Sequence, residues 1–184
     1  GGKADGNESM KNLLGGKGAN LAEMMSVLKL PVPHGFTVTT DACRAYMKSG
    51  WPKTLDKELA THVAQLEKKM GARLGDPSSP LLVSVRSGAK FSMPGMMDTV
   101  LNLGLNDKSV IALAATTNNE RFAYDSYRRF ISMYGRIVLG LDGAVFEHAL
   151  DKAKEVANAK SDADIPASAL KDLCEVYKKA VATV

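Results

Sequence analysis

Turn-forming residues are distributed unevenly along this sequence, and their distribution limits the folds that it can adopt. Thirteen of the 16 glycines and six of the seven prolines fall within residues 1–105, together with three short β-like runs. From residue 106 onward, apolar residues repeat at helical spacing, with short breaks between the runs. Since glycine and proline interrupt helices, the two parts should differ in structure. The sequence predicts an α+β protein, with a mixed sheet and helices at residues 1–105 and a small helical bundle at residues 106–184.

Apolar periodicity and turn residues together give the expected elements. The strongest strand is residues 81–86, an apolar run that we expect to be buried, and residues 99–103 are its expected return partner. A glycine turn at residues 15–18 should open the first helix, and a further short strand is expected at residues 36–39. Gly71 should end the third helix. The expected helices are residues 19–28, 41–48, 55–70, 106–115, 120–139, 142–156 and 166–181.

The composition excludes several classes of protein. An apolar fraction of 45% with a charged fraction of 24% is typical of a globular protein. The longest apolar stretch is far too short to cross a bilayer, so we expect no membrane span. The net charge of +4 is too small and too dispersed to indicate nucleic-acid binding. Two distant cysteines, Cys43 and Cys174, indicate a reduced, intracellular protein. No signal peptide is visible, and the missing initiator methionine leaves open that a preceding segment was removed.

The run Gly15-Gly16-Lys17-Gly18 is the first candidate for chemistry. A helix amino terminus presents unpaired N–H groups and the positive end of the helix dipole, and glycines let an anion approach the backbone closely. Lys17 would add a charge at the same place. The run matches neither common phosphate-loop pattern, because Gly18 follows the lysine and Leu21 stands where a third glycine belongs. An ordinary tight turn with a solvent-facing lysine therefore stays open as the alternative.

Arg86 is the second candidate, at the end of the strongest expected strand. Strand ends in α/β domains are where ligands bind, and a guanidinium matches phosphate oxygens with two parallel hydrogen bonds. The alternative is an arginine that is paired with a carboxylate on a neighbouring element. The sequence favours neither interpretation over the other.

The segment at residues 91–99, in the loop that follows the strongest expected strand, is the third candidate. Its functional interpretation is a lid that folds over phosphates while its methionines exclude water. The alternative is that the methionines fill a gap in the core, which methionine does readily. The residues that we assign to this lid are Ser92, Met93, Gly95, Met96, Met97, Asp98 and Thr99.

The other polar residues favour structural roles. Asp125, Arg128 and Arg129 have the spacing of ion pairs along one helix. No pair of carboxylates has a spacing suited to Mg²⁺ on a strand, so we expect no metal ligand within this chain. The histidines lack a metal-like or triad-like partner within a helical turn, and they are His34, His62 and His148.

Five segments together resemble the pyruvate, phosphate dikinase family. They cover nearly the whole chain in the family's order. The segment at residues 92–99 is the most telling, since the related phosphoenolpyruvate synthases and glucan dikinases typically differ there. The segments are NLLGGKGANLAEM at residues 12–24, VPHGFTV at 32–38, LVSVRSGA at 82–89, SMPGMMDT at 92–99 and RFAYDSYRRF at 121–130.

The resemblance implies an ATP-grasp-like domain, with its first lobe at residues 1–105 and a helical subdomain at residues 106–184. The family's full enzyme converts ATP, phosphate and pyruvate to AMP, pyrophosphate and phosphoenolpyruvate through a phosphorylated histidine on a swivelling domain. By motif, Lys17 and Arg86 match the family's ATP-phosphate-binding lysine and arginine. The resemblance also implies Mg²⁺ held by ligands outside this chain, and a homodimer formed through other regions of the enzyme.

The chain also departs from the family's pattern. The second ATP-grasp lobe, the phosphohistidine domain and the pyruvate barrel are missing. We therefore expect no catalytic residue within this chain, and we expect the chain alone to be inactive and a weak nucleotide binder. His34 stands where a second proline is common. Two alternatives stay open, a phosphoenolpyruvate synthase, which uses water where the dikinase uses phosphate, and a non-catalytic nucleotide-binding or regulatory module. The expected compartment is the cytoplasm, with a plastid or a glycosome as alternatives.

Overall fold

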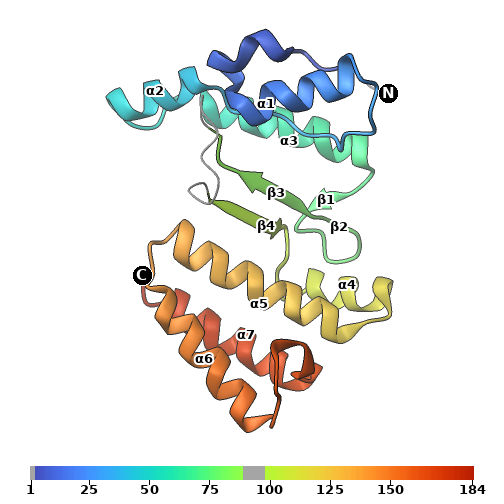
Figure 1. Ribbon diagram of the computed structural model, residues 1–184, viewed down its shortest axis with the longest axis vertical. Helices are drawn as coiled ribbons and strands as arrows, with labels where there is room; N and C mark the ends of the chain where they lie inside the picture. Colours follow the sequence, from blue (N-terminus) through green and yellow to red (C-terminus); the bar gives the residue numbers. More distant parts are fainter. Residues whose placement is uncertain (1–2, 89–97) are drawn as a thin grey trace. The chain divides into compact units, whose positions relative to one another are not determined.

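The computed structural model describes residues 3–88 and 98–184, and it combines helices with two small sheets (Figure 1). The contacts divide the chain into two compact units. Unit 1 comprises Gly1–Gly71 and Arg86–Met97, and unit 2 comprises Ala72–Val85 and Asp98–Val184. The mixture of helices and strands confirms the predicted α+β class.

Unit 1 is mainly helical within the part of the chain that the structure describes. Its elements are the 3-10 turn η1 (Glu8–Met10) and the helices α1 (Lys11–Ser26), α2 (Thr40–Ser49) and α3 (Leu55–Met70). The Thr39 hydroxyl caps α2 by accepting a hydrogen bond from the Ala42 N–H at 3.4 Å. Gly71 follows the last residue of α3 and caps the helix, as predicted, with a φ of +65°, the left-handed conformation that glycine adopts readily.

The strand predicted at residues 36–39 does not form. This segment connects α1 to α2, and it has no hydrogen-bonded strand partner among the described residues. The Phe36 ring lies instead beside the His62 ring of α3, with 5.5 Å between the ring centroids. β-branched and aromatic side chains suit a strand, but a strand also requires a partner ladder, which the local sequence does not reveal.

Unit 2 contains two sheets of two strands each, except that Arg86, the last residue of β3, belongs to unit 1. β1 (Arg73–Leu74) runs parallel to β2 (Pro80–Leu81), and β3 (Val83–Arg86) pairs with β4 (Thr99–Leu103), which confirms the predicted partnership. The single strand predicted at residues 81–86 is divided at Leu82. Its predicted burial is wrong, since Val85 is 50% exposed and Ser84 and Arg86 are exposed as well. Two strands form only a narrow ladder, so most side chains of β3 stay in contact with solvent.

Helices make up the remainder of unit 2, at the positions that the periodicity predicts. They are α4 (Ser109–Thr117), α5 (Glu120–Ile137), α6 (Gly143–Val156) and α7 (Ala167–Val181), with the 3-10 turn η2 (Asp162–Asp164) before α7. α5 is central, because it contacts α4, α7 and β4, while α6 packs against α7 (Figure 1). Within residues 3–88 and 98–184, no helix has the length and hydropathy that crossing a membrane requires.

Apolar burial is concentrated in unit 2. Among the described residues of unit 1, the buried ones are Gly15, Ala19 and Ala22. Burying a large apolar side chain contributes roughly 1.5–3 kcal/mol, whereas alanine contributes much less. Unit 2 therefore holds most of the hydrophobic stabilisation. Its buried apolar side chains are Leu81, Val100, Leu105, Val110, Ala123, Tyr124, Tyr127, Ile131, Phe146, Ile165, Leu170, Leu173, Cys174 and Tyr177.

The two units do not follow the boundary expected at residue 105. Residues 72–85 and 98–105 belong to the same compact unit as the helices from α4 onward. The Asn106 amide explains part of this grouping, since its Nδ2 donates to the Gly75 carbonyl at 3.0 Å and its Oδ1 accepts from the Ser109 N–H at 2.9 Å. One side chain thus connects the strand region to the start of α4. The assignment of residues 1–105 to one ATP-grasp-like lobe stays a prediction.

The uneven burial predicts that the two units differ in local stability. In native-state hydrogen exchange of the 184-residue chain, the amides of α5 and α7 should be the most protected, and those of α2 and α3 should exchange at least ten-fold faster. The reason is that opening α5 or α7 exposes the aromatic core, whereas opening α2 or α3 exposes little buried surface. Equal protection across both units would contradict this explanation.

Candidate functional site

The glycine turn lies inside α1 and divides it. Gly15 is buried and has φ +69° and ψ +168°, a backbone conformation that is essentially restricted to glycine. The helical path resumes at Gly16, so Gly16, Lys17 and Gly18 form the first turn of the following helical segment. Helix starts leave the N–H groups of their first turn without intrahelical acceptors. The predicted arrangement of a glycine turn that opens a helix is therefore present, with a short helical turn before it.

Two threonines from the segment before and within α2 brace this turn. A Cβ atom at Gly18 would lie 3.2 Å from Thr37 Oγ1 and 3.3 Å from Thr37 Cγ2, so the absence of a side chain lets Thr37 approach the helix closely. The Thr40 hydroxyl donates to the Asn12 carbonyl at 2.6 Å, at the start of α1. Gly15 and Gly18 thus have different structural reasons to be glycine, one conformational and one steric.

Lys17 reaches across 70 residues of sequence to the end of β3. Its Nζ atom donates a hydrogen bond to the Ser87 carbonyl at 2.8 Å, and both residues belong to unit 1. Ser87 directly follows Arg86, the second predicted phosphate-binding residue. The structure therefore brings the Lys17 ammonium to the backbone next to Arg86.

Arg86 is the last residue of β3, and its side chain is exposed. No carboxylate in residues 3–88 or 98–184 forms an ion pair with it. The alternative interpretation, an arginine neutralised by a neighbouring acidic residue, thus has no partner in the described part of the chain. A guanidinium in this situation is available to an anionic ligand.

Most of the predicted lid lies outside the described residues, namely Ser92, Met93, Gly95, Met96 and Met97. Of its two described members, Asp98 is exposed and Thr99 is the first residue of β4. The role of this segment stays a prediction.

The described side chains do not fit a metal centre. No three His, Cys, Asp or Glu side chains within residues 3–88 and 98–184 gather as a metal-binding group. The three histidines are exposed, and His62 lies against Phe36. No step of chemistry through a metal follows from these residues.

Comparison with known proteins identifies relatives along nearly the whole chain. The sequence model of the family described as pyruvate phosphate dikinase, AMP/ATP-binding domain, matches residues 11–53 and 48–130. Pyruvate, phosphate dikinase of Giardia intestinalis is 55% identical over 173 residues, which are 94% of this chain and 20% of that protein. The chloroplastic pyruvate, phosphate dikinase 1 of Arabidopsis thaliana is 54% identical over 179 residues, 96% of this chain and 18% of that protein. The chloroplastic pyruvate, phosphate dikinase 1 of Zea mays is 54% identical over 180 residues, 97% of this chain and 19% of that protein.

The chain belongs to the pyruvate, phosphate dikinase family. It spans about a fifth of the length of the curated relatives that it matches. The part of the sequence that matches the dikinase AMP/ATP-binding domain contains the glycine turn, Lys17 and Arg86. The resemblance to this family that the sequence motifs predict is confirmed.

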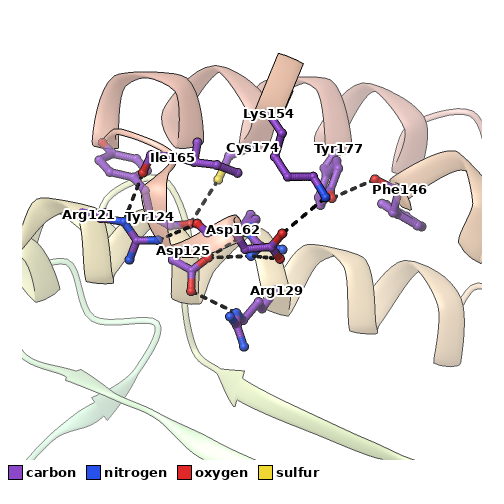
Figure 2. A network of polar contacts seen from close by, with 11 residues as sticks. Arg121, Tyr124, Asp125, Arg129, Phe146, Lys154, Asp162, Ile165, Cys174 and Tyr177 are labelled. Carbon is purple, nitrogen blue, oxygen red and sulfur yellow. Dashed lines mark hydrogen bonds and ion pairs between the residues drawn. The ribbon is translucent and has the colours of Figure 1, made fainter. Parts of the chain in front are cut away.

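A polar network in unit 2 connects α5 of this dikinase domain to the link before α7 (Figure 2). The Arg128 side chain is only 6% exposed, and its guanidinium lies 2.7 Å from Asp125 Oδ1 and 3.2 Å from Asp162 Oδ2. Arg121 adds hydrogen bonds to the carbonyls of Asp162 at 2.6 Å and Ile165 at 3.1 Å. The network holds the segment before α7 against α5, which indicates a structural role.

Sequence reasoning found only part of this network. The predicted ion pairs within α5 are confirmed, since Asp125 pairs with both Arg128 and Arg129, the latter at 2.9 Å. Asp162 was missed, because it lies between α6 and α7, 34 residues away from Arg128. The available signal was the position of Arg128 among apolar residues on the buried face of α5.

Asp107 joins α5 and α7 at a second place. Its Oδ1 accepts hydrogen bonds from the Lys178 ammonium at 2.7 Å and the Tyr127 hydroxyl at 3.0 Å. The hydrogen bond from Lys178 lowers the pKa of Asp107, burial opposes this shift, and the bond from Tyr127 adds to it. Burial and the Asp107 carboxylate together raise the pKa of Tyr127. The carboxylate is therefore favoured in the folded state.

Replacing Gly15 by Ala should destabilise the glycine turn, because an alanine at φ +69° and ψ +168° costs roughly 1–3 kcal/mol. We expect faster hydrogen exchange of the amides in residues 16–26. Gly35→Ala is the matched control, since an added Cβ there meets no atom within 4 Å. An unchanged exchange pattern in G15A would show that the turn tolerates another conformation.

The lowered pKa of Asp107 makes its contribution to stability depend on pH. A carboxyl group whose pKa is lower in the folded state stabilises the protein above its unfolded pKa of about 3.9, and this stabilisation is lost as the pH falls through the folded value. Asp107→Asn should lower the free energy of unfolding at pH 7 by up to about 1 kcal/mol, since the pair with Lys178 is partly exposed.

Denaturant titrations of wild type and D107N at several pH values measure this effect. The difference between the two proteins should be constant between pH 6 and 8 and should shrink below about pH 4. A difference that persists undiminished at pH 2 would show that the carboxylate charge does not cause it.

Proposed function

We propose that this chain supplies the phosphate-binding part of the ATP site of a pyruvate, phosphate dikinase. In the whole enzyme, ATP, phosphate and pyruvate are converted to AMP, pyrophosphate and phosphoenolpyruvate, and a phosphohistidine on another domain carries the phosphoryl group. Lys17 and Arg86 bind and orient the ATP phosphates. The observation that carries this proposal is the hydrogen bond of 2.8 Å between Lys17 Nζ and the Ser87 carbonyl, because it joins the glycine turn to the residue after Arg86.

The chemistry of these groups suits a polyphosphate. Backbone N–H groups at Gly16–Gly18 can donate to phosphate oxygens, the Lys17 ammonium adds a point charge, and the Arg86 guanidinium adds a planar pair of donors. Cations that are already in place stabilise the charge that develops during phosphoryl transfer. Unit 1 as a whole has 12 Lys and Arg against 7 Asp and Glu in its sequence, which favours an anionic ligand.

The finer architecture belongs to the same proposal. On this proposal the elements around α1 and β3 contribute to the first lobe of an ATP-grasp-like domain, and α4–α7 form its helical subdomain. Mg²⁺ would be bound by carboxylates outside these 184 residues, in the remaining four fifths of the enzyme. Ser92–Thr99 would act as the lid over the phosphates, and the dimer contacts would lie in other regions.

Two other functions are less well supported. A phosphoenolpyruvate synthase would share the lysine and the arginine, but the relatives at 52–55% identity carry the dikinase name. A non-catalytic nucleotide-binding module would require that the phosphate ligands work without the rest of the enzyme. Phosphate dependence of the full-length enzyme separates the dikinase from the synthase.

Replacing Arg86 by Ala in a full-length dikinase that contains this domain tests the proposed role. The partial reaction that consumes ATP and phosphate to phosphorylate the histidine should slow by about 100-fold or more, because a preplaced cation is removed from the phosphates. Transfer from the phosphohistidine to pyruvate should keep its rate. Each half reaction can be followed separately in single-turnover experiments.

Arg44→Ala is the matched control, since Arg44 is an exposed arginine on α2 that pairs with Asp41. R44A should leave both partial reactions unchanged. If R86A slowed both half reactions equally, Arg86 would have no specific role at the ATP site.

A further inference from the structure

The end of β3 is fixed by few contacts within the part of the chain that the structure describes. Arg86, Ser87 and Gly88 are all exposed, so burial does not hold them. The Arg86 side chain has no carboxylate partner among the described residues. The hydrogen bond from Lys17 Nζ to the Ser87 carbonyl is therefore a principal side-chain constraint on this segment.

We propose that Lys17 is a positioning residue for Arg86, in addition to being a phosphate ligand itself. This inference rests on the proposed function for its consequence in catalysis. The hydrogen bond between Lys17 and Ser87, which we call the tether, exists without a nucleotide. Consecutive Cα atoms are 3.8 Å apart, so holding the Ser87 carbonyl limits how far the neighbouring Arg86 backbone can move. The origin of the Arg86 side chain is then held next to the Lys17 ammonium before a ligand arrives.

The donors of the ammonium allow both roles at once. A lysine ammonium has three N–H donors and no acceptor, and the Ser87 carbonyl takes one of them. Two donors remain for phosphate oxygens, so a ligand can bind without breaking the tether. Because the flexible lysine chain is already ordered, part of its entropy loss precedes binding.

The helix that carries Lys17 is held by contacts of its own, so the tether starts from an ordered backbone. Thr37 packs against Gly18, the residue that follows Lys17, and Thr40 donates to the carbonyl of Asn12 in the preceding turn. A tether from a loosely held helix would transmit little order. The bracing allows Lys17 to restrict the end of β3 through a single hydrogen bond.

NMR relaxation of the nucleotide-free 184-residue chain tests the tether directly. The wild-type chain should show amide order parameters near 0.8 at Ser87 and Gly88, and Lys17→Met should lower them below about 0.6. The Nε–H order parameter of the Arg86 side chain should fall together with them. Lys17→Arg should restore most of the order, because a guanidinium can also donate to the Ser87 carbonyl.

Lys57→Met is the matched control, since Lys57 is an exposed lysine in the first turn of α3. K57M should leave all three order parameters unchanged. Preserved amide chemical-shift dispersion in α1 would show that K17M remains folded, and Thr37→Ser provides a milder change if K17M does not fold. Weakening the contact between Thr37 and Gly18 should lower the order at Ser87 by a smaller amount.

The outcomes separate the tether from the ATP site. Order parameters at Ser87 and Gly88 that are equal in wild type and K17M, or already below 0.6 in wild type, would overturn the proposal. A loss of order in K17M together with an unaffected ATP half reaction in R86A would retain the tether and reject the phosphate site. A loss of order in K17M together with a slower ATP half reaction in R86A would support both proposals.

Discussion

Unit 2 depends on the burial of one guanidinium, that of Arg128. An unpaired charge in such a position costs several kcal/mol, whereas a paired one is tolerated. Asp125 lies one turn earlier on α5 and supplies one carboxylate, but the second comes from Asp162, beyond α6. Asp125 is shared with Arg129, so the Arg128 charge is compensated more fully when the link before α7 lies on α5. The contact holds the segment before α7 against α5, where the neighbouring Ile165 is fully buried in the core.

Unit 1 is held together by a different kind of interaction. Its buried described residues are small, and its specific contacts are polar or steric, such as the Thr40 hydroxyl on the Asn12 carbonyl and Thr37 against Gly18. Such contacts contribute about 1 kcal/mol each, much less than a packed aromatic side chain. They are directional, however, and directional contacts define the orientation of a backbone turn better than apolar packing does. Unit 2 thus provides most of the hydrophobic stabilisation, whereas the directional contacts of unit 1 define the conformation of the glycine turn.

The sequence predicted the helices of unit 2 well because each contains its own signal. α5 repeats apolar residues at helical spacing and begins after Asn119, whose side chain accepts a hydrogen bond from the Phe122 N–H. The strands were harder to predict from the sequence, because a strand depends on a partner that lies elsewhere in the chain. Residues 36–39 have suitable side chains but no ladder among the described residues, and the run at residues 81–86 is divided and exposed. Asp162 was missed for the same reason, since its partner Arg128 is distant in sequence.

In the candidate site, the glycine run is a weak local pattern, and a contact with a residue distant in sequence supports its interpretation. The glycine run matches no common phosphate motif, and its lysine alone could equally have pointed into solvent. The hydrogen bond to Ser87 places the exposed Lys17 ammonium beside the backbone next to Arg86, which gives the lysine a defined direction. A group that binds phosphate has to face water before the ligand arrives, so it cannot be ordered by burial without a large desolvation cost. A hydrogen bond to a backbone carbonyl orders the ammonium and keeps it exposed, which is the state that a polyphosphate site requires.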